Sequence, residues 1–92
     1  MKNVSILLKS PQTTIVDVRT PAEFMGGHVA GSINIPLNEI PQKINEFKSG
    51  SDIVLCCASG GRSAQAAMYL RQQGIACEDG GSWLSVNYLK NN

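Results

Sequence analysis

Two runs of apolar, largely β-branched residues mark the chain, at residues 14–18 and at residues 52–57. Each run is almost continuously apolar, which is typical of a strand buried on both faces rather than of one with a face in water. Between the runs, Ile40, Ile44 and Phe47 recur at the spacing that places side chains on one face of a helix. Strands that alternate with helices on a short chain predict an α/β fold, in which helices cover both faces of a parallel sheet.

Shorter segments complete the predicted order of elements. Thr20 and Pro21 are residue types that favour the N-cap and the first position of a helix, and Glu23 lies in its first turn. This short helix is expected to end at Gly26 and Gly27. The other predicted elements are a helix over 4–9, a very short strand within 28–36, a helix over 63–73 that Gly74 caps, a strand over 75–78, a loop at Gly80 and Gly81, and a last helical turn or two over 83–89.

The length and charge of the chain limit what it can be. It has 92 residues, which is room for one domain over residues 1–92 and not for a second. The formal net charge is +1 and the eight lysines and arginines are not clustered, so no basic patch predicts a nucleic acid or an anionic membrane as a partner. The apolar patch at residues 6–8 is shorter than a secretory signal or a membrane span requires. We therefore expect a soluble, cytoplasmic domain.

Three cysteines, Cys56, Cys57 and Cys77, and a single histidine offer neither a disulfide framework nor the spacing of metal ligands. Cys56 and Cys57 are adjacent, so their side chains point to opposite faces of a strand and a bridge between them would be strained. A reducing compartment is the simpler interpretation, and we expect no metal and no organic cofactor.

The segment at residues 53–69, IVLCCASGGRSAQAAMY, joins a strand, a tight loop and the start of a helix. Its apolar run ends in the two adjacent cysteines, and Arg62 lies where the helical pattern begins. Backbone N–H groups of such a loop, and those of the first turn of the helix, can converge on a point just beyond the strand. A cysteine at that point is held partly as the thiolate because the surrounding dipoles favour the anion. The sequence therefore predicts a nucleophilic cysteine in an anion-binding loop.

Asp17 and Arg19 come at the end of the first predicted strand. Residues two apart on a strand share a face, so we expect these side chains to form a structural ion pair. Since sites in parallel sheets form at the carboxyl ends of the strands, this pair is expected near the cysteine.

Four segments, in this order along the chain, carry the residues DVRTPAEF at 17–24, GHVAGSINIP at 27–36, CASGGRSA at 57–64, and Gly80-Gly81 followed by Trp83. Together they resemble a single-domain rhodanese, a sulfurtransferase. Each motif alone is weak, but four motifs in order at fitting spacings are a strong signal. The resemblance runs from about residue 14 to residue 83 and so covers most of the chain.

The resemblance implies a three-layer α/β domain with a central, mostly parallel sheet of five strands. It also implies a thiolate that takes the outer sulfur atom of a donor such as thiosulfate, holds it as a persulfide, and passes it to cyanide or to a thiol, which can be a protein thiol. The position that matches the nucleophile is Cys57. The positions that match the persulfide-binding loop are Ala58, Ser59, Gly60, Gly61 and Arg62, and those that match a supporting pair near the loop are Asp17 and Arg19.

The adjacent cysteines allow a second register. Four residues separate Cys57 from Arg62, whereas five separate Cys56 from Arg62, which is the spacing of cysteine phosphatases and arsenate reductases. The placement of the glycines, and the lack of a histidine before Cys56, favour Cys57 as the nucleophile. A phosphatase-like or arsenate reductase-like activity from Cys56, and a non-catalytic protein-binding module, are the alternatives. The intact cysteine and loop argue against the module.

Five further residues receive ordinary structural interpretations or a narrower role. A cation at the start of a helix is unfavourable, so Arg62 is expected to face an anion. Cys56 and Cys77 are expected to be buried core thiols. His28 is expected to bond to backbone in a turn rather than to act as a general base, and Trp83 to pack in the core or at its rim.

Overall fold

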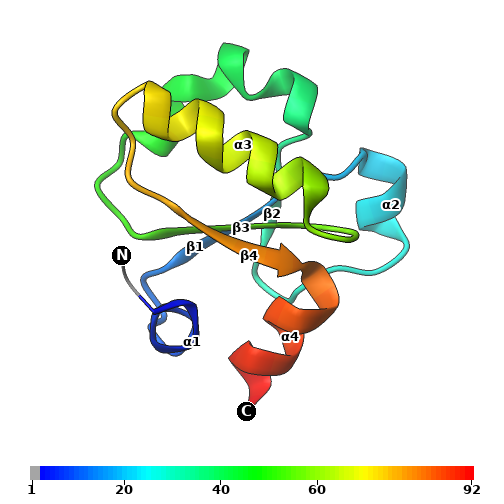
Figure 1. Ribbon diagram of the computed structural model, residues 1–92. Coiled ribbons are helices and arrows are strands. Elements are labelled where there is room, and N and C mark those ends of the chain that lie inside the picture. The colour runs from blue at the N-terminus through cyan, green and yellow to red at the C-terminus, as the bar shows by residue number, and fades with distance from the viewer. Residues whose placement is uncertain (1–2) are drawn as a thin grey trace.

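The computed structural model describes residues 3–92 and shows a fully parallel sheet between two layers of helices (Figure 1). The sheet has the strand order β2-β1-β3-β4, so the two strands with the longest apolar runs lie at its centre. The strands are β1 (Thr14–Asp17), β2 (Ile33–Asn34), β3 (Ile53–Cys57) and β4 (Glu78–Ser82). The predicted α/β class, with a parallel sheet and helices on both faces, is confirmed.

Strand β3 is buried on both faces of the sheet, which explains why its sequence is apolar at every position. All five of its residues are buried, and their side chains alternate between the two faces of the sheet. Ile53, Leu55 and Cys57 belong to the core on one face, whereas Val54 and Cys56 belong to the core on the other. The two adjacent cysteines therefore point into different layers, as the sequence predicts.

Helix α3 (Gly61–Gln72) and the 3-10 segments η1 (Leu37–Glu39) and η2 (Pro41–Phe47) cover the face that includes Cys57 (Figure 1). Ile40 and Phe47 are buried there, as the helical spacing predicts, but the expected α-helix over this stretch is wrong. The turns are of the 3-10 type and are interrupted at Lys43, whose φ of −112° and ψ of 22° are not helical. Pro41 has no N–H to donate and stands at the first position of η2, so η1 and η2 cannot form one continuous regular helix through it.

Helices α1 (Val4–Leu7) and α4 (Trp83–Asn91) cover the opposite face, below the sheet in Figure 1. Side chains at Asn3 and Ser82 cap the two helices by accepting bonds from N–H groups of their first turns. Val86 of α4 is fully buried against this face, and Trp83 is half-buried at its edge. In residues 3–92 no helix is long and apolar enough to span a bilayer.

Two predictions about strands are wrong. The sequence predicts the last strand at residues 75–78 and a loop at Gly80 and Gly81, yet β4 spans Glu78–Ser82 and contains both glycines. Its pairing with β3 shifts between Leu55 and Cys57, so two β4 residues lie opposite one β3 residue, as in a β-bulge. The described residues form four strands, one fewer than the five that the family resemblance implies.

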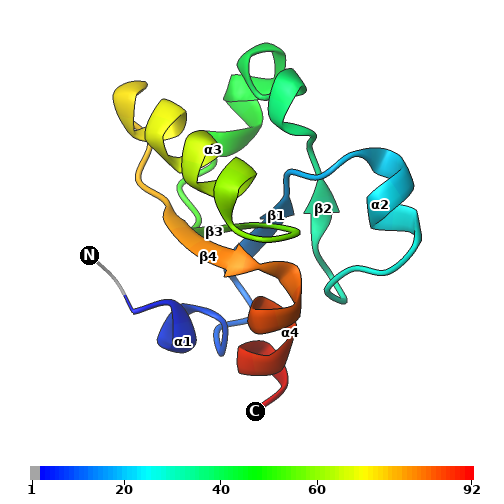
Figure 2. The same ribbon diagram turned by 45° about the vertical axis from the view of Figure 1, so that its right-hand side comes forward.

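Helix α2 (Pro21–Met25) begins with a capping box that fixes its first turn. The Thr20 hydroxyl accepts from the Glu23 N–H at 3.3 Å, and a Glu23 carboxylate oxygen accepts from the Thr20 N–H at 3.0 Å. The helix ends at Gly26, as the sequence predicts. Figure 2 shows α2 at the same end of the sheet as the loop that joins β3 to α3.

Candidate active site

Cys57 is the last residue of β3, and its sulfur lies under the start of α3. The Gly60 N–H donates a hydrogen bond to Sγ at 2.9 Å, and the Ser63 hydroxyl lies 3.4 Å from the same sulfur. Ser63 is itself fully buried, and its hydroxyl also reaches the Gly60 carbonyl at 3.1 Å. The sulfur is thus held in a pocket of hydrogen-bond donors, with 1% of the residue exposed.

These contacts set the ionisation of the Cys57 thiol. Burial by itself raises the pKa, because a low-dielectric site disfavours the thiolate. Hydrogen bonds from the Ser63 hydroxyl and from the N–H groups of Ser63, Gly60 and Ser59 act in the other direction. The donors outweigh burial, and the pKa of Cys57 lies below the ordinary value of a cysteine.

The cysteine loop, defined here as residues 58–62, contributes mainly its backbone to this arrangement. Gly60 has a φ of 105°, in the left-handed region that glycine adopts without a steric penalty, and this conformation precedes the first turn of α3. The place where a side chain would emerge from Gly60 faces the Gly81 Cα of β4 at 3.7 Å. Two glycine backbones therefore meet beside the sulfur, while Ala58 and Ser59 are exposed.

The other two cysteines lie in different surroundings. Cys56 is fully buried in the opposite layer, and burial, with the negative charge of Asp17 second, raises the pKa of its thiol to about 12. Cys77 is buried beside α3, and burial raises the pKa of its thiol as well. Both are core thiols, as expected, and of the three cysteines only Cys57 has a lowered pKa.

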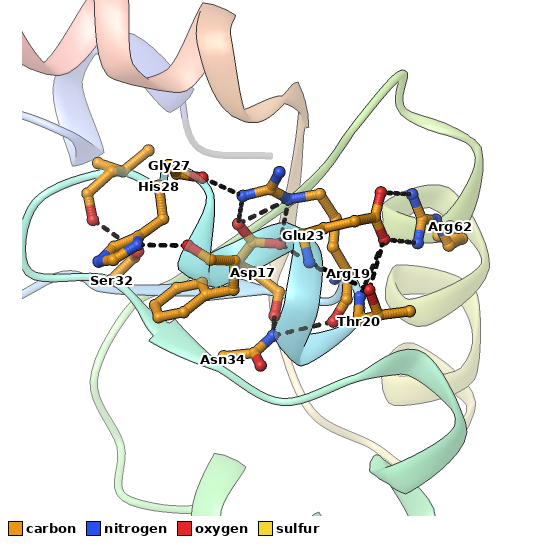
Figure 3. Close-up of polar contacts among 11 residues, drawn as sticks. Asp17, Arg19, Thr20, Glu23, Gly27, His28, Ser32, Asn34 and Arg62 are labelled. Atoms are coloured by element: carbon orange, nitrogen blue, oxygen red, sulfur yellow. Dashed lines mark hydrogen bonds and ion pairs between the residues drawn. The ribbon is translucent and has the colours of Figure 1, made fainter.

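Asp17 and Arg19 form the expected ion pair, and both are almost completely buried (Figure 3). The Arg19 guanidinium donates to both carboxylate oxygens of Asp17, with a shortest distance of 2.7 Å. It also donates to the Gly27 carbonyl at 2.7 Å and lies 4.9 Å from the ring centre of Trp83. The pair therefore ties the end of β1 to the turn after α2 and to the start of α4.

Arg62 faces an anion, and that anion is a side chain of the protein (Figure 3). Its two terminal nitrogens donate to the two carboxylate oxygens of Glu23 at 2.6 and 2.9 Å. The bonds from Arg62, followed by that from the Thr20 N–H, lower the pKa of Glu23 to about 2. The pair connects the first turn of α2 to the first turn of α3 and so links the cysteine loop to its neighbouring helix.

His28 and Trp83 have the structural roles that the sequence predicts. The Nδ1 atom of His28 lies 2.7 Å from the Phe24 carbonyl, and its ring stacks on that of Phe24 with the centres 3.7 Å apart. Trp83 packs over Arg19 and lies so close to Gly27 that a Cβ there would be 3.3 Å from the indole.

Sequence reasoning missed two participants in the site, Ser63 and the partner of Arg62. Ser63 directly follows Arg62 at the start of a helix, and a small polar residue there, with its side chain facing the strand end, is the signal that could have identified it. For Glu23 the sequence predicts only a favourable position in the first turn of α2, not a partner for Arg62. Within residues 3–92, no group of three or more histidine, cysteine or acidic side chains could hold a metal ion.

The comparisons with known proteins agree on the family. A family model described as a rhodanese-like domain matches residues 2–84. A sulfurtransferase of Allochromatium vinosum is 40% identical over 68 residues, which are 74% of this chain and 64% of that protein. The thiosulfate sulfurtransferase GlpE of Stutzerimonas stutzeri is 30% identical over 69 residues, which are 75% of this chain and 63% of that protein. The chain thus matches less than two thirds of the length of either relative.

Solved structures show the same fold. A rhodanese-like domain protein from Staphylococcus aureus has a TM-score of 0.77 and 33% identity, over 88% of this chain and 79% of that one. The protein SSP1007 from Staphylococcus saprophyticus has a TM-score of 0.75 and 37% identity, over 86% of this chain and 84% of that one. The chain therefore belongs to the family of rhodanese-like domains.

Proposed function

We propose that the chain is a sulfurtransferase that carries sulfane sulfur as a persulfide on Cys57. The observation that carries the proposal is the environment of the Cys57 sulfur, which combines backbone and hydroxyl donors with a lowered pKa. The sulfurtransferase names of two relatives agree with it. No metal or organic cofactor takes part in the proposed reaction.

In the first half-reaction the Cys57 thiolate attacks the outer sulfur of the donor. With thiosulfate, a new S–S bond forms to Cys57 while the bond between the two sulfur atoms of the donor breaks, and sulfite leaves with the electron pair. The terminal sulfur of the resulting persulfide carries a negative charge. The N–H groups of Ser59, Gly60 and Ser63, which already lower the pKa of the thiol, are the donors available to stabilise that charge.

In the second half-reaction an acceptor attacks the terminal sulfur. Cyanide or a thiolate forms the new bond, the S–S bond to Cys57 breaks, and the Cys57 thiolate leaves with the electron pair and is ready for another donor. Neither step needs an oxidant or a general base, because sulfur enters and leaves between groups that are already anionic. This agrees with the position of His28, which is engaged by the Phe24 carbonyl.

The contacts of Cys56 weigh against a phosphatase-like or arsenate reductase-like activity. Its thiol has a pKa of about 12 and is fully buried on the face opposite to that of the cysteine loop, so it is neither ionised nor directed toward the loop. The retained nucleophile and its donors likewise favour an enzyme over a module that only binds a protein.

The test is the mass of the intact protein after incubation with thiosulfate and then with a thiol. We expect a gain of about 32 Da, the mass of one sulfur atom, that is lost again on addition of the thiol. Cys57→Ser should not gain this mass and should lose sulfur transfer to cyanide. Cys56→Ala, which removes a buried thiol from the other face, is the matched control and should still gain the sulfur.

A Cys57→Ser protein that transfers sulfur would overturn the assignment of the nucleophile. A wild-type protein that gains no sulfur from any sulfane donor, while it remains folded, would overturn the proposed function as a whole.

A further inference from the structure

Two arginines lie at the end of the sheet that carries the cysteine loop, and each is paired with a carboxylate. Residues 58–61 are uncharged, and Arg62 is the single cation of the loop. Both terminal nitrogens of Arg62 are engaged by both carboxylate oxygens of Glu23, at 2.6 and 2.9 Å. This end-on pair occupies the terminal edge of the guanidinium and compensates its positive charge with the carboxylate of Glu23, so Arg62 presents no net charge to a second anion.

Glu23 is held in place independently of Arg62. One of its carboxylate oxygens accepts from the Thr20 N–H at 3.0 Å and from the Thr20 hydroxyl at 3.1 Å (Figure 3). These bonds form the capping box of α2, so the carboxylate is anchored from its own helix before it meets the arginine. The negative charge opposite Arg62 is therefore a built feature of α2 rather than a chance contact between two mobile side chains.

The second guanidinium of this region is neutralised in the same way. Arg19 is buried, with 5% exposed, and is bound to Asp17 through three N–H contacts to its carboxylate. Two arginines and two carboxylates thus contribute no net charge to the end of the sheet where Cys57 lies. The backbone N–H groups of the loop can stabilise one negative charge on sulfur. Neither Arg19 nor Arg62 is left unpaired to stabilise a second negative charge on the substrate.

We infer that Glu23 is a specificity-determining residue, which neutralises Arg62 and so directs the site to sulfane-sulfur donors with no more than one negative charge, such as thiosulfonates and alkyl persulfides, in preference to dianionic thiosulfate. The inference rests on the proposed function of Cys57. With an alkyl thiosulfonate, the Cys57 thiolate bonds to the outer sulfur, the S–S bond of the donor breaks, and the sulfinate leaves with the electron pair.

The test compares thiosulfate and methanethiosulfonate, two donors that both transfer an outer sulfane sulfur but differ by one negative charge. For each, kcat/KM is measured at low ionic strength with cyanide as the acceptor. In Glu23→Gln the Arg62 guanidinium is no longer neutralised, and glutamine can keep the capping box. We expect the ratio of kcat/KM for thiosulfate to that for methanethiosulfonate to rise by about five-fold.

The matched control is Glu78→Gln. Glu78 also pairs with an arginine, Arg71, at 3.6 Å. However, it is the first residue of β4, so it lies at the amino end of the parallel strands, whereas Cys57 lies at their carboxyl end. The same charge change there should leave the donor ratio unaltered. Added salt should reduce the gain in Glu23→Gln toward the wild-type ratio, a response that a merely structural role of Glu23 would not produce.

A donor ratio that is the same in wild type and Glu23→Gln, in a protein that still gains sulfur on Cys57, would overturn this inference and leave the proposed function intact. An equal rise in Glu78→Gln would also overturn it, because net charge rather than position would then be the cause. Absence of the Cys57 persulfide with both donors would instead overturn the proposed function.

Discussion

The Ser63 hydroxyl has one hydrogen and two acceptors within reach, the Cys57 sulfur at 3.4 Å and the Gly60 carbonyl at 3.1 Å. When Cys57 is a thiol, its S–H can donate to the Ser63 oxygen while the hydroxyl donates to Gly60. When Cys57 is a thiolate, the hydroxyl can turn and donate to the sulfur. Ser63 can therefore satisfy both ionisation states without any backbone movement.

We expect Ser63→Ala to raise the pKa of Cys57, since a hydrogen bond that favours the thiolate is lost. The rate of Cys57 alkylation by iodoacetamide, followed against pH, reports the thiolate. In the wild type its inflection should lie below 9.0, the ordinary value, and in Ser63→Ala it should move upward. An unmoved inflection in a protein with unchanged thermal unfolding would show that the backbone donors alone set the ionisation.

The same shift predicts the sign of a stability effect. The pKa of Cys57 is lower in the folded protein than in the unfolded chain, so the folded state gains stability above the unfolded pKa. That gain is lost as the pH falls through the folded pKa. Cys57→Ser should therefore show a smaller rise in unfolding free energy than the wild type when the pH is raised across this window.

At this scale the sequence predicted what depends on near neighbours. The alternation of side chains along a strand separated Cys56 from Cys57, and the two-residue spacing of Asp17 and Arg19 predicted their pairing. The partner of Arg62 could not be predicted in this way, because Glu23 is 39 positions away and meets it only once α2 and α3 are in place.

Strand β4 shows how an element can depend on having no side chain. A Cβ added at Gly80 would lie 2.6 Å from a methyl carbon of Val86 and 2.9 Å from one of Val54, closer than real contacts allow. The glycine lets the strand pass between α4 and β3. Sequence patterns assign a Gly-Gly pair to a loop, so the position of β4 was predicted wrongly for a reason that lies in tertiary packing.

We expect Gly80→Ala to lower the free energy of unfolding by about 1–3 kcal/mol, as overpacking of a close-packed core does. Gly61→Ala is the control, because no atom lies within 4 Å of the new Cβ. At the start of α3, alanine should leave stability unchanged or raise it by up to about 1 kcal/mol. Urea denaturation measures both, and an equal effect of the two substitutions would contradict the packing argument.

The whole molecule consists of two cores that share one sheet. The larger core lies between the sheet and α3, and the smaller core lies between the sheet and helices α1 and α4. Both cores contain alternate residues of the same strands. Neither core can therefore unfold without exposing the side of β3 that faces the other core. We therefore expect a single cooperative unfolding transition.

The smaller core can be tested within α4. Val86 is fully buried whereas Leu84, two residues earlier, is 62% exposed. Val86→Ala should lower the free energy of unfolding by about 2 kcal/mol, and Leu84→Ala should change it by less than about 0.5 kcal/mol.

The fluorescence of Trp83, the one tryptophan, and far-UV circular dichroism should give the same midpoint of unfolding. Different midpoints would show that the two cores unfold separately.

The architecture was the most predictable level. Continuous apolar runs predicted central parallel strands, and handed crossovers placed helices on both faces. The number of strands was less predictable, because the expected five came from the resemblance, whereas the patterns in this chain itself predict the four strands that the described part of the chain contains.

The meeting of Gly60 and Gly81 beside the sulfur has a consequence for how this protein can change. Most of the groups around the Cys57 sulfur belong to the main chain, which every amino acid supplies alike. Many neighbouring side chains can therefore be substituted in evolution without altering these groups. Adaptation to a new donor would then fall on peripheral positions such as Glu23. A protein engineer who wishes to redirect this scaffold should vary that periphery and leave the two glycines untouched.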